Sequence, residues 1–448
     1  MTTRSSRRLS RLVVYVLVVL MGLPPGMIVR AAAATKRTAR FTGKNFLESL
    51  RNPQFSSGAA NRLVFTNGPT TLTGSGGGSF TVPAMSGYSA FAEPQASWLP
   101  FKGKIEWAAR DVFMPGVGLD LSFERIWRGS VSAFDGPLGQ QWEFNWNKRL
   151  FEPDATSNVT FYEAGRKETY TYSAGNFTSP AGRYDSLVRQ TAPNPDEYTR
   201  TDREGIQETY EFDTNSGSTV TWYRLKEIKD LNNNALTFAY DGSRNLTKVT
   251  DTLARDTTLS YDGNDRITKI MDTASREWVY GYDGGGLLTT VRTPTVDVAD
   301  ATDDFTSGKT TTYKYDSGNK LTEVVRPGDG GTGKWKWTYD GAFVTKETRS
   351  GNDINLVHDT TNHYVTVADR EGITTRYAYE ATNFMMTSRR VYSSFPSTYW
   401  ETTWAYDSNN EVTSAIFPKG NRILYTYDGS GNILTVDFKK DAGDASPV

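Results

Sequence analysis

Residues 261–270 read Tyr-Asp-Gly-Asn-Asp-Arg-Ile-Thr-Lys-Ile, and residues 315–324 read Tyr-Asp-Ser-Gly-Asn-Lys-Leu-Thr-Glu-Val. Both stretches contain a Tyr-Asp pair, a polar turn, and an apolar residue six positions after the Tyr. An Asp side chain can bond to backbone N–H groups two residues ahead, and Gly and Asn tolerate positive φ. Each stretch therefore predicts a β-hairpin whose first strand ends at the Tyr-Asp pair.

The Tyr-Asp pair recurs through the second half of the chain. Three intervals between successive Tyr residues are 21 positions long, and the longer ones indicate insertions between copies. Such a period identifies a tandem repeat. We assign a structural role to the signature residues Tyr240, Asp241, Tyr261, Asp262, Tyr282, Asp283, Tyr315, Asp316, Tyr339, Asp340, Tyr379, Glu380, Tyr406, Asp407, Tyr427 and Asp428.

A large apolar side chain, usually aromatic, lies two residues before each signature Tyr. A spacing of two places both rings on one face of a strand. An apolar residue such as Leu246 follows the Tyr by six positions, and a second one such as Val249 lies three positions further. That odd spacing puts the two aliphatic side chains on opposite faces unless a β-bulge intervenes. The sequence leaves both arrangements open.

The composition favours an all-β protein of tandem antiparallel hairpins. Tyr, Phe and Trp make up 13% of the chain, and aromatic and β-branched residues suit a pleated surface. Two strands per copy widen a sheet by roughly 10 Å, so eight or nine copies span about 80 Å. A twisted sheet of that width is expected to coil or close.

Charge and cysteine content exclude several classes of protein. The formal net charge is −1, and we find no basic stripe that would predict binding to nucleic acid. The chain contains no Cys, which excludes thiol catalysis, Cys-based zinc sites and disulfides.

The first residues resemble a secretory signal peptide. A basic head that ends at Arg11 precedes an apolar run from Leu12 to Leu23, and small residues at Ala31 to Ala34 offer a cleavage site. We therefore predict a secreted or cell-surface protein with no stable membrane span after signal cleavage. The predicted domains are a signal peptide (1–34), a Gly/Ser/Thr-rich linker (35–95), an N-terminal β domain (96–200) and a repeat array (201–448).

The repeat resembles the tyrosine-aspartate (YD) repeat of the RHS family. The stretch from about Asp111 to Leu150 is similar to the domain that precedes these repeats in bacterial members, notably at Pro115 to Leu119, at Gly136 to Gly139 and at Trp142. The resemblance covers about residues 105–438. It implies a sheet that spirals into a hollow shell around an effector polypeptide, often a toxin.

The chain departs from the RHS pattern at its C-terminal end. It contains no Asp-Pro dipeptide and therefore lacks the Asp-Pro-x-Gly motif that closes RHS shells. It stops at Val448 with no downstream effector, so the resemblance does not carry shell closure, self-cleavage or toxin release over to this chain. The sequence leaves open a truncated chain or a short array that a further shell-forming polypeptide completes.

The sequence predicts no catalytic, cofactor-binding or metal-binding residue. The only histidines, His358 and His363, lie five apart and are expected on opposite faces of a strand. Asp230, Asn232 and Asn234 imitate the start of a calcium loop, but Ala235 replaces the required Gly. We interpret this stretch as a repeat turn.

The leading functional prediction is a non-enzymatic scaffold that encloses or presents a toxin or effector polypeptide. The alternative is a cell-surface protein that binds a glycan or a protein through exposed aromatic side chains, for which we single out Trp222, Trp335 and Trp400. A third reading is a secreted hydrolase. Continued repeats and a downstream effector would favour the scaffold, and saturable binding to a polysaccharide would favour the alternative.

Overall fold

The computed structural model describes residues 101–443 except 130–134, 154–156, 164–165, 192–195, 214–220 and 296–306, together with the backbone at 63–64, 70–73, 79–82 and 95–100. Within these ranges the chain forms strands and one short 3₁₀ helix, η1 (Pro100–Lys102), and no α-helix. None of the described residues lies in a helix long and apolar enough to span a membrane. The prediction of an all-β fold is confirmed, whereas the predicted signal peptide lies outside the described residues.

The first sheet has five strands in the order β1-β4-β5-β6-β9, and we call it the inner sheet. Its side chains alternate between buried and half-buried along β6, as expected when a sheet faces different surroundings on its two sides. Two further hairpins, β2-β3 and β7-β8, each form a two-stranded sheet. The bounds in this part of the chain are β1 Leu63–Val64, β2 Thr70–Thr73, β3 Ser79–Val82, β4 Gln95–Leu99, β5 Lys104–Met114, β6 Leu121–Arg128, β7 Asp135–Gly136, β8 Gly139–Gln140 and β9 Trp142–Phe144.

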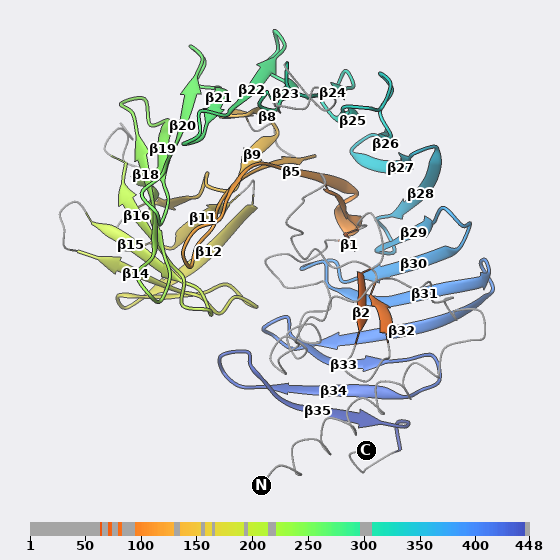
Figure 1. The fold of residues 1–448 in the computed structure, drawn as a ribbon. Helices are drawn as coiled ribbons and strands as arrows, with labels where there is room; N and C mark the ends of the chain where they lie inside the picture. The colour runs from red at the N-terminus through yellow and green to blue at the C-terminus, as the bar shows by residue number, and fades with distance from the viewer. Residues whose placement is uncertain are drawn as a thin grey trace.

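The second sheet has 26 strands, from β10 to β35, each paired with the next along the chain. Figure 1 shows that this sheet curls around the inner sheet, as its width predicts. Its first eight strands are β10 Arg149–Glu152, β11 Val159–Glu163, β12 Arg166–Ser173, β13 Asn176–Thr178, β14 Ser186–Gln190, β15 Glu197–Thr201, β16 Gln207–Phe212 and β17 Thr221–Lys229. The remaining strands, which we call the wall, are β18 Ala235–Tyr240, β19 Leu246–Thr250, β20 Asp256–Tyr261, β21 Ile267–Met271, β22 Glu277–Tyr282, β23 Leu288–Arg292, β24 Thr310–Tyr315, β25 Leu321–Val325, β26 Trp335–Asp340, β27 Phe343–Arg349, β28 Asn352–Asp359, β29 Tyr364–Ala368, β30 Thr374–Tyr379, β31 Met386–Ser394, β32 Thr398–Tyr406, β33 Val412–Ile416, β34 Arg422–Tyr427 and β35 Ile433–Lys439.

Strand β17 divides the large sheet into a closed part and an open part. Its first residues pair with β10, with Thr221 opposite Glu152, so β10 to β17 form a closed circuit that we call the barrel. Its last residues pair with β18, with Lys229 opposite Ala235, and this pairing begins the wall. The predicted domain boundary at residue 200 falls inside β15, within the barrel, and the predicted linker contains β1, β2 and β3. The domain division stays a prediction.

Each repeat hairpin contains a β-bulge, which resolves the question left open by the odd spacing of its aliphatic residues. In the hairpin of β18 and β19, Tyr240 is opposite Leu246, whereas Ala239 is opposite Lys248, so Thr247 has no partner residue. The extra residue turns Leu246 and Val249 to the same face, and both are buried. The same shift occurs in the other Tyr-Asp hairpins.

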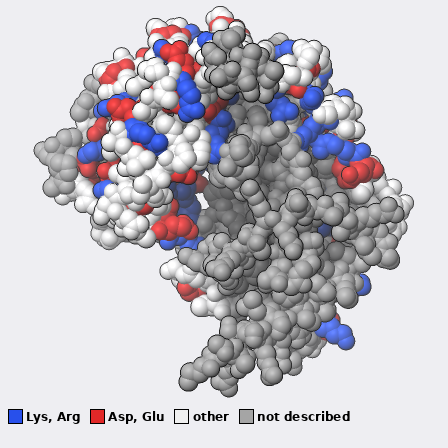
Figure 2. Space-filling view, viewed as in Figure 1, with Lys and Arg blue, Asp and Glu red and all other residues white. Residues whose placement is uncertain are grey.

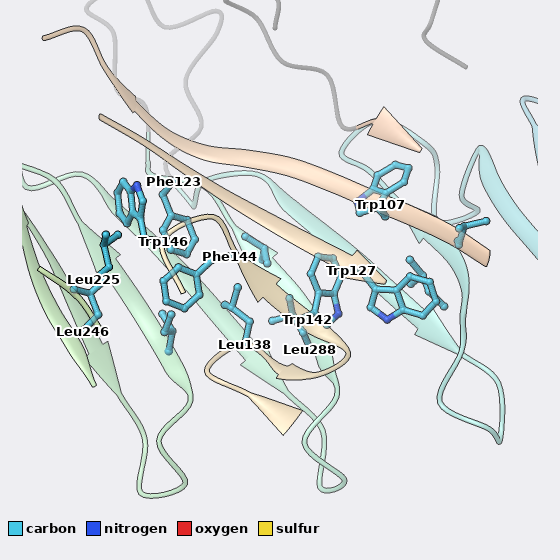
Figure 3. Packing of buried hydrophobic residues seen from close by; sticks show 14 of the residues in the cluster. Trp107, Phe123, Trp127, Leu138, Trp142, Phe144, Trp146, Leu225, Leu246 and Leu288 are labelled. Atoms are coloured by element: carbon cyan, nitrogen blue, oxygen red, sulfur yellow. The ribbon is translucent and has the colours of Figure 1, made fainter. Parts of the chain in front are cut away.

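The main core lies between the inner sheet and the concave face of the wall. Figure 3 shows Trp107, Trp127 and Trp142 of the inner sheet above wall residues such as Leu288. Buried residues from both sheets form one apolar cluster that continues into the barrel. Burial of apolar surface of this kind contributes roughly 25 cal/mol per Å², so the inner sheet is an integral part of the fold.

Candidate functional site: the concave face of the wall

The hydroxyl groups of seven of the eight signature Tyr residues each connect one hairpin to the hairpin before it. Tyr261, for example, donates a hydrogen bond to the carbonyl oxygen of Leu246 at 2.8 Å. Burial raises the pKa of Tyr261, so the phenol stays protonated and remains a donor. The equivalent bonds run from Tyr240 to Leu225, from Tyr282 to Ile267, from Tyr315 to Leu288, from Tyr339 to Leu321, from Tyr406 to Met386 and from Tyr427 to Val412, at 2.6 to 2.8 Å.

The signature Asp side chains close the turns. Oδ1 of Asp262 accepts the backbone N–H groups of Asn264 and Arg266 at 2.9 and 3.0 Å, and the next-to-last turn residue, Asp265, has φ of +58°. Asp241, Asp283, Asp316, Asp407 and Asp428 make the same pair of bonds. Two signature positions differ, because Asp340 lies within β26 before a two-residue turn and Glu380 accepts the N–H of Asn383.

The stretch that imitates a calcium loop forms a repeat turn. Oδ1 of Asp230 accepts the N–H groups of Asn232 and Asn234 at 2.8 and 2.9 Å, and Oδ2 accepts the Asn234 amide at 2.7 Å. Both carboxylate oxygens are thus used within the turn, as the sequence interpretation expects. The described residues contain no group of three or more His, Asp or Glu side chains placed to hold a metal ion.

A buried polar cluster joins the inner sheet to the wall. Arg125 of β6 forms a two-point ion pair with Asp111 of β5 at 2.5 and 3.0 Å. Two wall residues complete the cluster, because Arg125 donates to the Tyr313 hydroxyl at 2.8 Å and the Tyr280 hydroxyl donates to Asp111 at 2.7 Å. Although burial opposes it, Asp111 holds the pKa of Arg125 above its ordinary value. The cluster fixes the inner sheet over β22 and β24.

Tryptophan side chains cover the middle of the concave face. Trp107 of β5 makes edge contacts with Trp335 and Trp337 of β26, with ring centroids 5.2 and 5.6 Å apart. The expectation that Trp335 is a surface residue is therefore wrong, since it is only 2% exposed. Trp335 lies outside the repeat signature, and the local sequence does not indicate that the inner sheet covers it. Trp400 is 40% exposed, as expected.

Trp222, the third predicted surface aromatic, is half-buried at the junction of the barrel. Its ring packs against Phe151 and Tyr162, with centroids 5.0 and 5.3 Å apart. The guanidinium group of Arg149 lies 5.6 Å from the ring centroid. These contacts occupy much of the indole surface.

The β7-β8 hairpin and the turn before β5 also touch the wall through backbone hydrogen bonds. The backbone N–H groups of Gln140 and Val344 donate to Gly286 and Gly103, at 3.3 and 2.8 Å. Gly139 has φ of +82°, and a Cβ there would lie 2.2 Å from the Gly286 carbonyl oxygen, so this close approach requires glycine. A further contact with the wall lies at η1, where the ring of Phe101 stacks on the ring of Tyr379 with centroids 4.7 Å apart.

Barrel residues take part in a buried network of charges. Glu208 accepts hydrogen bonds from Lys148 at 2.5 Å, from Arg200 at 2.7 Å and from the Tyr210 hydroxyl at 2.5 Å. Arg200 also bonds to Asp185 at 2.7 Å. Burial by itself raises the pKa of Glu208, but the two cations lower it to about 2. Such networks stabilise a fold only when nearly every member is satisfied, as most are here.

The two histidines lie apart from these clusters. Nε2 of His358 is 2.9 Å from the carbonyl oxygen of Val344, and burial lowers the pKa of this ring. His363 occupies a turn with φ of +54°, and its ring contacts Tyr379 edge-on. Neither ring joins the aromatic rings of Trp107, Trp335 and Trp337 that pack at the middle of the concave face.

Two family models match the chain. The RHS Repeat model matches residues 261–295, and the model described as Domain of unknown function (DUF6531) matches residues 102–170, which contain most of the inner sheet. These matches and the hairpin geometry define a repeat scaffold in which an inner sheet packs inside a curled wall. The chain is an RHS/YD-repeat protein. The comparison with curated proteins found no match.

Several solved structures are similar in part. A crystal structure of TcdB2-TccC3 shares 12% identity over 76% of this chain and 20% of that chain, with a TM-score of 0.30. A structure of the Photorhabdus luminescens Tc holotoxin pore shares 12% identity over 77% of this chain and 20% of that chain, with a TM-score of 0.30. The N-terminal domain of the effector protein SpvB from Salmonella typhimurium shares 12% identity over 71% of this chain and 100% of that chain, with a TM-score of 0.21. The chain spans about a fifth of the length of the first of these.

Proposed function

We propose that this chain is an exported, non-enzymatic RHS scaffold whose wall forms part of a shell that encloses or presents an effector polypeptide, such as a toxin. The family matches and the geometry of the hairpins support the assignment as an RHS-type repeat scaffold. Export rests on the basic head and apolar run before residue 24, which lie outside the described residues. The same sequence features support a secreted or cell-surface location.

The observation that carries the proposal is the difference between the two faces of the wall. The concave face is apolar and already packs against polypeptide, namely the inner sheet. The outer face carries ion pairs between neighbouring strands, for example Lys269 with Glu277 at 2.9 Å. A closed or coiled sheet with this polarity presents charge to solvent and shields the chain that it surrounds.

The concave face also offers apolar surface beyond the inner sheet. The aromatic position two residues before the signature Tyr is buried at Phe238, Tyr280 and Trp337. The equivalent residues Trp404 and Tyr425 are half-buried. This change supports a role for the last hairpins in holding a further segment of polypeptide. Catalysis is not part of the proposal, because the polar clusters described here are engaged in packing the fold.

Native proteolysis followed by mass spectrometry tests the enclosing role. Protein isolated from its natural source is digested, and we expect protected peptides from the wall and from a second polypeptide segment. Gly139→Ala, which pushes the β7-β8 hairpin away from the wall, is expected to reduce the protection of that second segment. Gly175→Ala is the matched control, because a Cβ there meets nothing within 4 Å. Protection of wall peptides alone in all samples would contradict the proposal.

A further inference from the structure

The last strand of the large sheet has a free edge. Strand β35 pairs with β34 from Ile433 to Lys439, and the part of the chain that the structure describes places no strand on its other side. At the opposite end of the sheet, β10 is paired on both sides, with β11 and with β17. Figure 1 shows β35 as the final strand of the curl. A free edge presents a row of backbone donors and acceptors with which another strand can pair.

Strand β35 has few of the features that protect natural sheet edges. Short strands, Pro residues and bulges are common means of protection. The strand is seven residues long and contains no Pro. Its bulge lies at its beginning, between Ile433 and Thr435, and the residues from Thr435 to Lys439 keep a regular register with β34. The edge is therefore able to accept a strand along most of its length.

Elsewhere on the wall, cations of the outer face meet anions on the neighbouring strand. Figure 2 shows basic and acidic side chains interspersed on the visible surface. Opposite charges across strands stabilise a sheet, and like charges directly opposite destabilise it. Pairs of opposite charge are Lys248 with Asp256, Lys269 with Glu277 and Lys314 with Glu323.

Strand β35 carries two charges without such a partner. Asp437 is opposite Leu424, and Lys439 is directly opposite another cation, Arg422. Neither Asp437 nor Lys439 forms an ion pair within the residues that the structure describes. The last hairpin thus leaves a carboxylate and an ammonium group for a partner on the free side of β35.

Both charges lie on the outer face of the wall. Tyr425 occupies the aromatic position two residues before a signature Tyr, which belongs to the concave face, and it is opposite Val436. Successive side chains of a strand point to opposite faces. Asp437 and Lys439 therefore point outward, and Phe438 between them points to the concave side.

We propose that two copies of this chain pair through the free edges of their β35 strands, antiparallel and about a two-fold axis that passes beside Phe438. In this register Asp437 of each copy is opposite Lys439 of the other, and two cross-strand ion pairs form. Each Lys439 gains the anion that its own sheet does not supply. A two-fold contact uses the same self-complementary surface on both copies. This role goes beyond the scaffold function and does not depend on an enclosed polypeptide.

Face direction and charge select this register among its neighbours. Because side chains alternate, a slip by one residue would join the concave face of one copy to the outer face of the other. The axis must therefore pass beside a residue. An axis at Asp437 places two carboxylates opposite each other, an axis at Lys439 does the same with two ammonium groups, and an axis at Val436 brings no charges together. Within β35, an axis at Phe438 is the one that opposes unlike charges.

A strand from a different protein fits this edge less well. Such a strand has to present a cation opposite Asp437 and an anion opposite Lys439, both on its outer face, or else bury unpaired charges at the contact. The second copy meets this requirement with the same two residues. Charge complementarity thus favours self-association over capture of an arbitrary strand.

Sedimentation velocity of the whole chain at a series of concentrations tests the proposal. We expect the starting protein to form a dimer. Asp437→Lys and Lys439→Asp each replace two attractive pairs by two repulsive ones, and each should weaken the dimer about thirtyfold. An equal mixture of the two variants restores opposite charges at both pairs, so it should dimerise like the starting protein.

Two further variants complete the experiment. Asp437→Lys combined with Lys439→Asp in one chain exchanges the charges, keeps both pairs attractive and should dimerise. Glu371→Lys is the matched control, because it makes the same change of charge in an exposed turn between β29 and β30 and should leave the dimer unchanged. Circular dichroism checks that every variant is folded.

The outcomes divide clearly. A dimer that is lost in both single variants, retained in Glu371→Lys and recovered in the mixture and in the exchanged variant supports the proposal. A starting protein that is monomeric at every concentration overturns it, and so does a dimer that survives in both single variants. A mixture and an exchanged variant that are folded but remain monomeric would also overturn it.

Discussion

Replacing Tyr315 with Phe tests how the inner sheet is fastened to the wall. The Tyr315 hydroxyl accepts the indole N–H of Trp142 at 2.8 Å and donates to the carbonyl oxygen of Leu288 at 2.6 Å. Tyr261 is the matched reference, because its hydroxyl makes the same bond to the preceding hairpin and has no bond to the inner sheet. The two variants therefore differ by one buried donor left without a partner.

The expected magnitudes follow from these contacts. A buried polar group that loses its partner costs about 1–3 kcal/mol. Tyr261→Phe leaves one carbonyl oxygen and should lower the free energy of unfolding by about 1 kcal/mol. Tyr315→Phe leaves both a carbonyl oxygen and the fully buried Trp142 N–H, and should cost about 2–4 kcal/mol.

Urea unfolding, followed by tryptophan fluorescence and by circular dichroism, measures the difference. The unfolding free energies of the variants can be compared when the two probes give coincident transitions. If the transitions differ, native-state hydrogen exchange measures the free energies instead. Trp142→Phe completes a double-mutant cycle with Tyr315→Phe, and we expect a coupling free energy of about 1 kcal/mol. Equal losses in Tyr315→Phe and Tyr261→Phe, with no coupling, would refute the idea that this bond fastens the inner sheet.

Three further outcomes are expected. The two cations bonded to Glu208 lower its pKa to about 2 against the effect of burial, so its contribution to stability is present above about pH 5 and is lost as pH falls toward 2. Glu208→Gln should flatten the acid limb of the unfolding free energy, and an unchanged limb would contradict this. Burial raises the pKa of Glu143 to about 7. The contribution of this group to the free energy of unfolding is therefore full below about pH 4.5 and is lost as pH rises through 7. Glu143→Gln should remove that decline in stability between pH 5 and 8. Gly139→Ala should cost more than about 2 kcal/mol, because positive φ and the nearby Gly286 carbonyl both oppose a Cβ, whereas Gly175→Ala should cost about 1 kcal/mol from φ alone. Equal thermal shifts in the two alanine variants would show that the close approach at Gly139 is unimportant.

The hairpin unit was determined by the sequence itself because its causes are local. The bonds of Asp262 reach two and four residues ahead, and the hydroxyl of Tyr261 reaches the carbonyl group of a residue 15 positions earlier. A repeating pattern of Tyr, Asp and turn residues contains all of this information. The expectation that a sheet of this width coils has a similarly simple origin in strand twist.

Only the tertiary structure decided how the faces of the strands are used. The spacing of Leu246 and Val249 allowed two arrangements, and the bulge at Thr247 selected the one that buries both. Trp335 was expected at the surface, but Trp107, far away in the chain, covers it. Such contacts depend on where distant segments pack, which the local pattern of a strand does not record.

The same division applies to the architecture and to the register of neighbouring strands. Repeat spacing predicted the succession of strands, but the closure of β10 on β17 depends on which edges meet after the chain has curled. Arg376 and Arg390 are 14 positions apart in a stretch with ordinary composition, and only strand register brings them face to face. The sequence thus determined the repeating hairpin through short-range hydrogen bonds, whereas long-range packing decided what each face of the wall contacts.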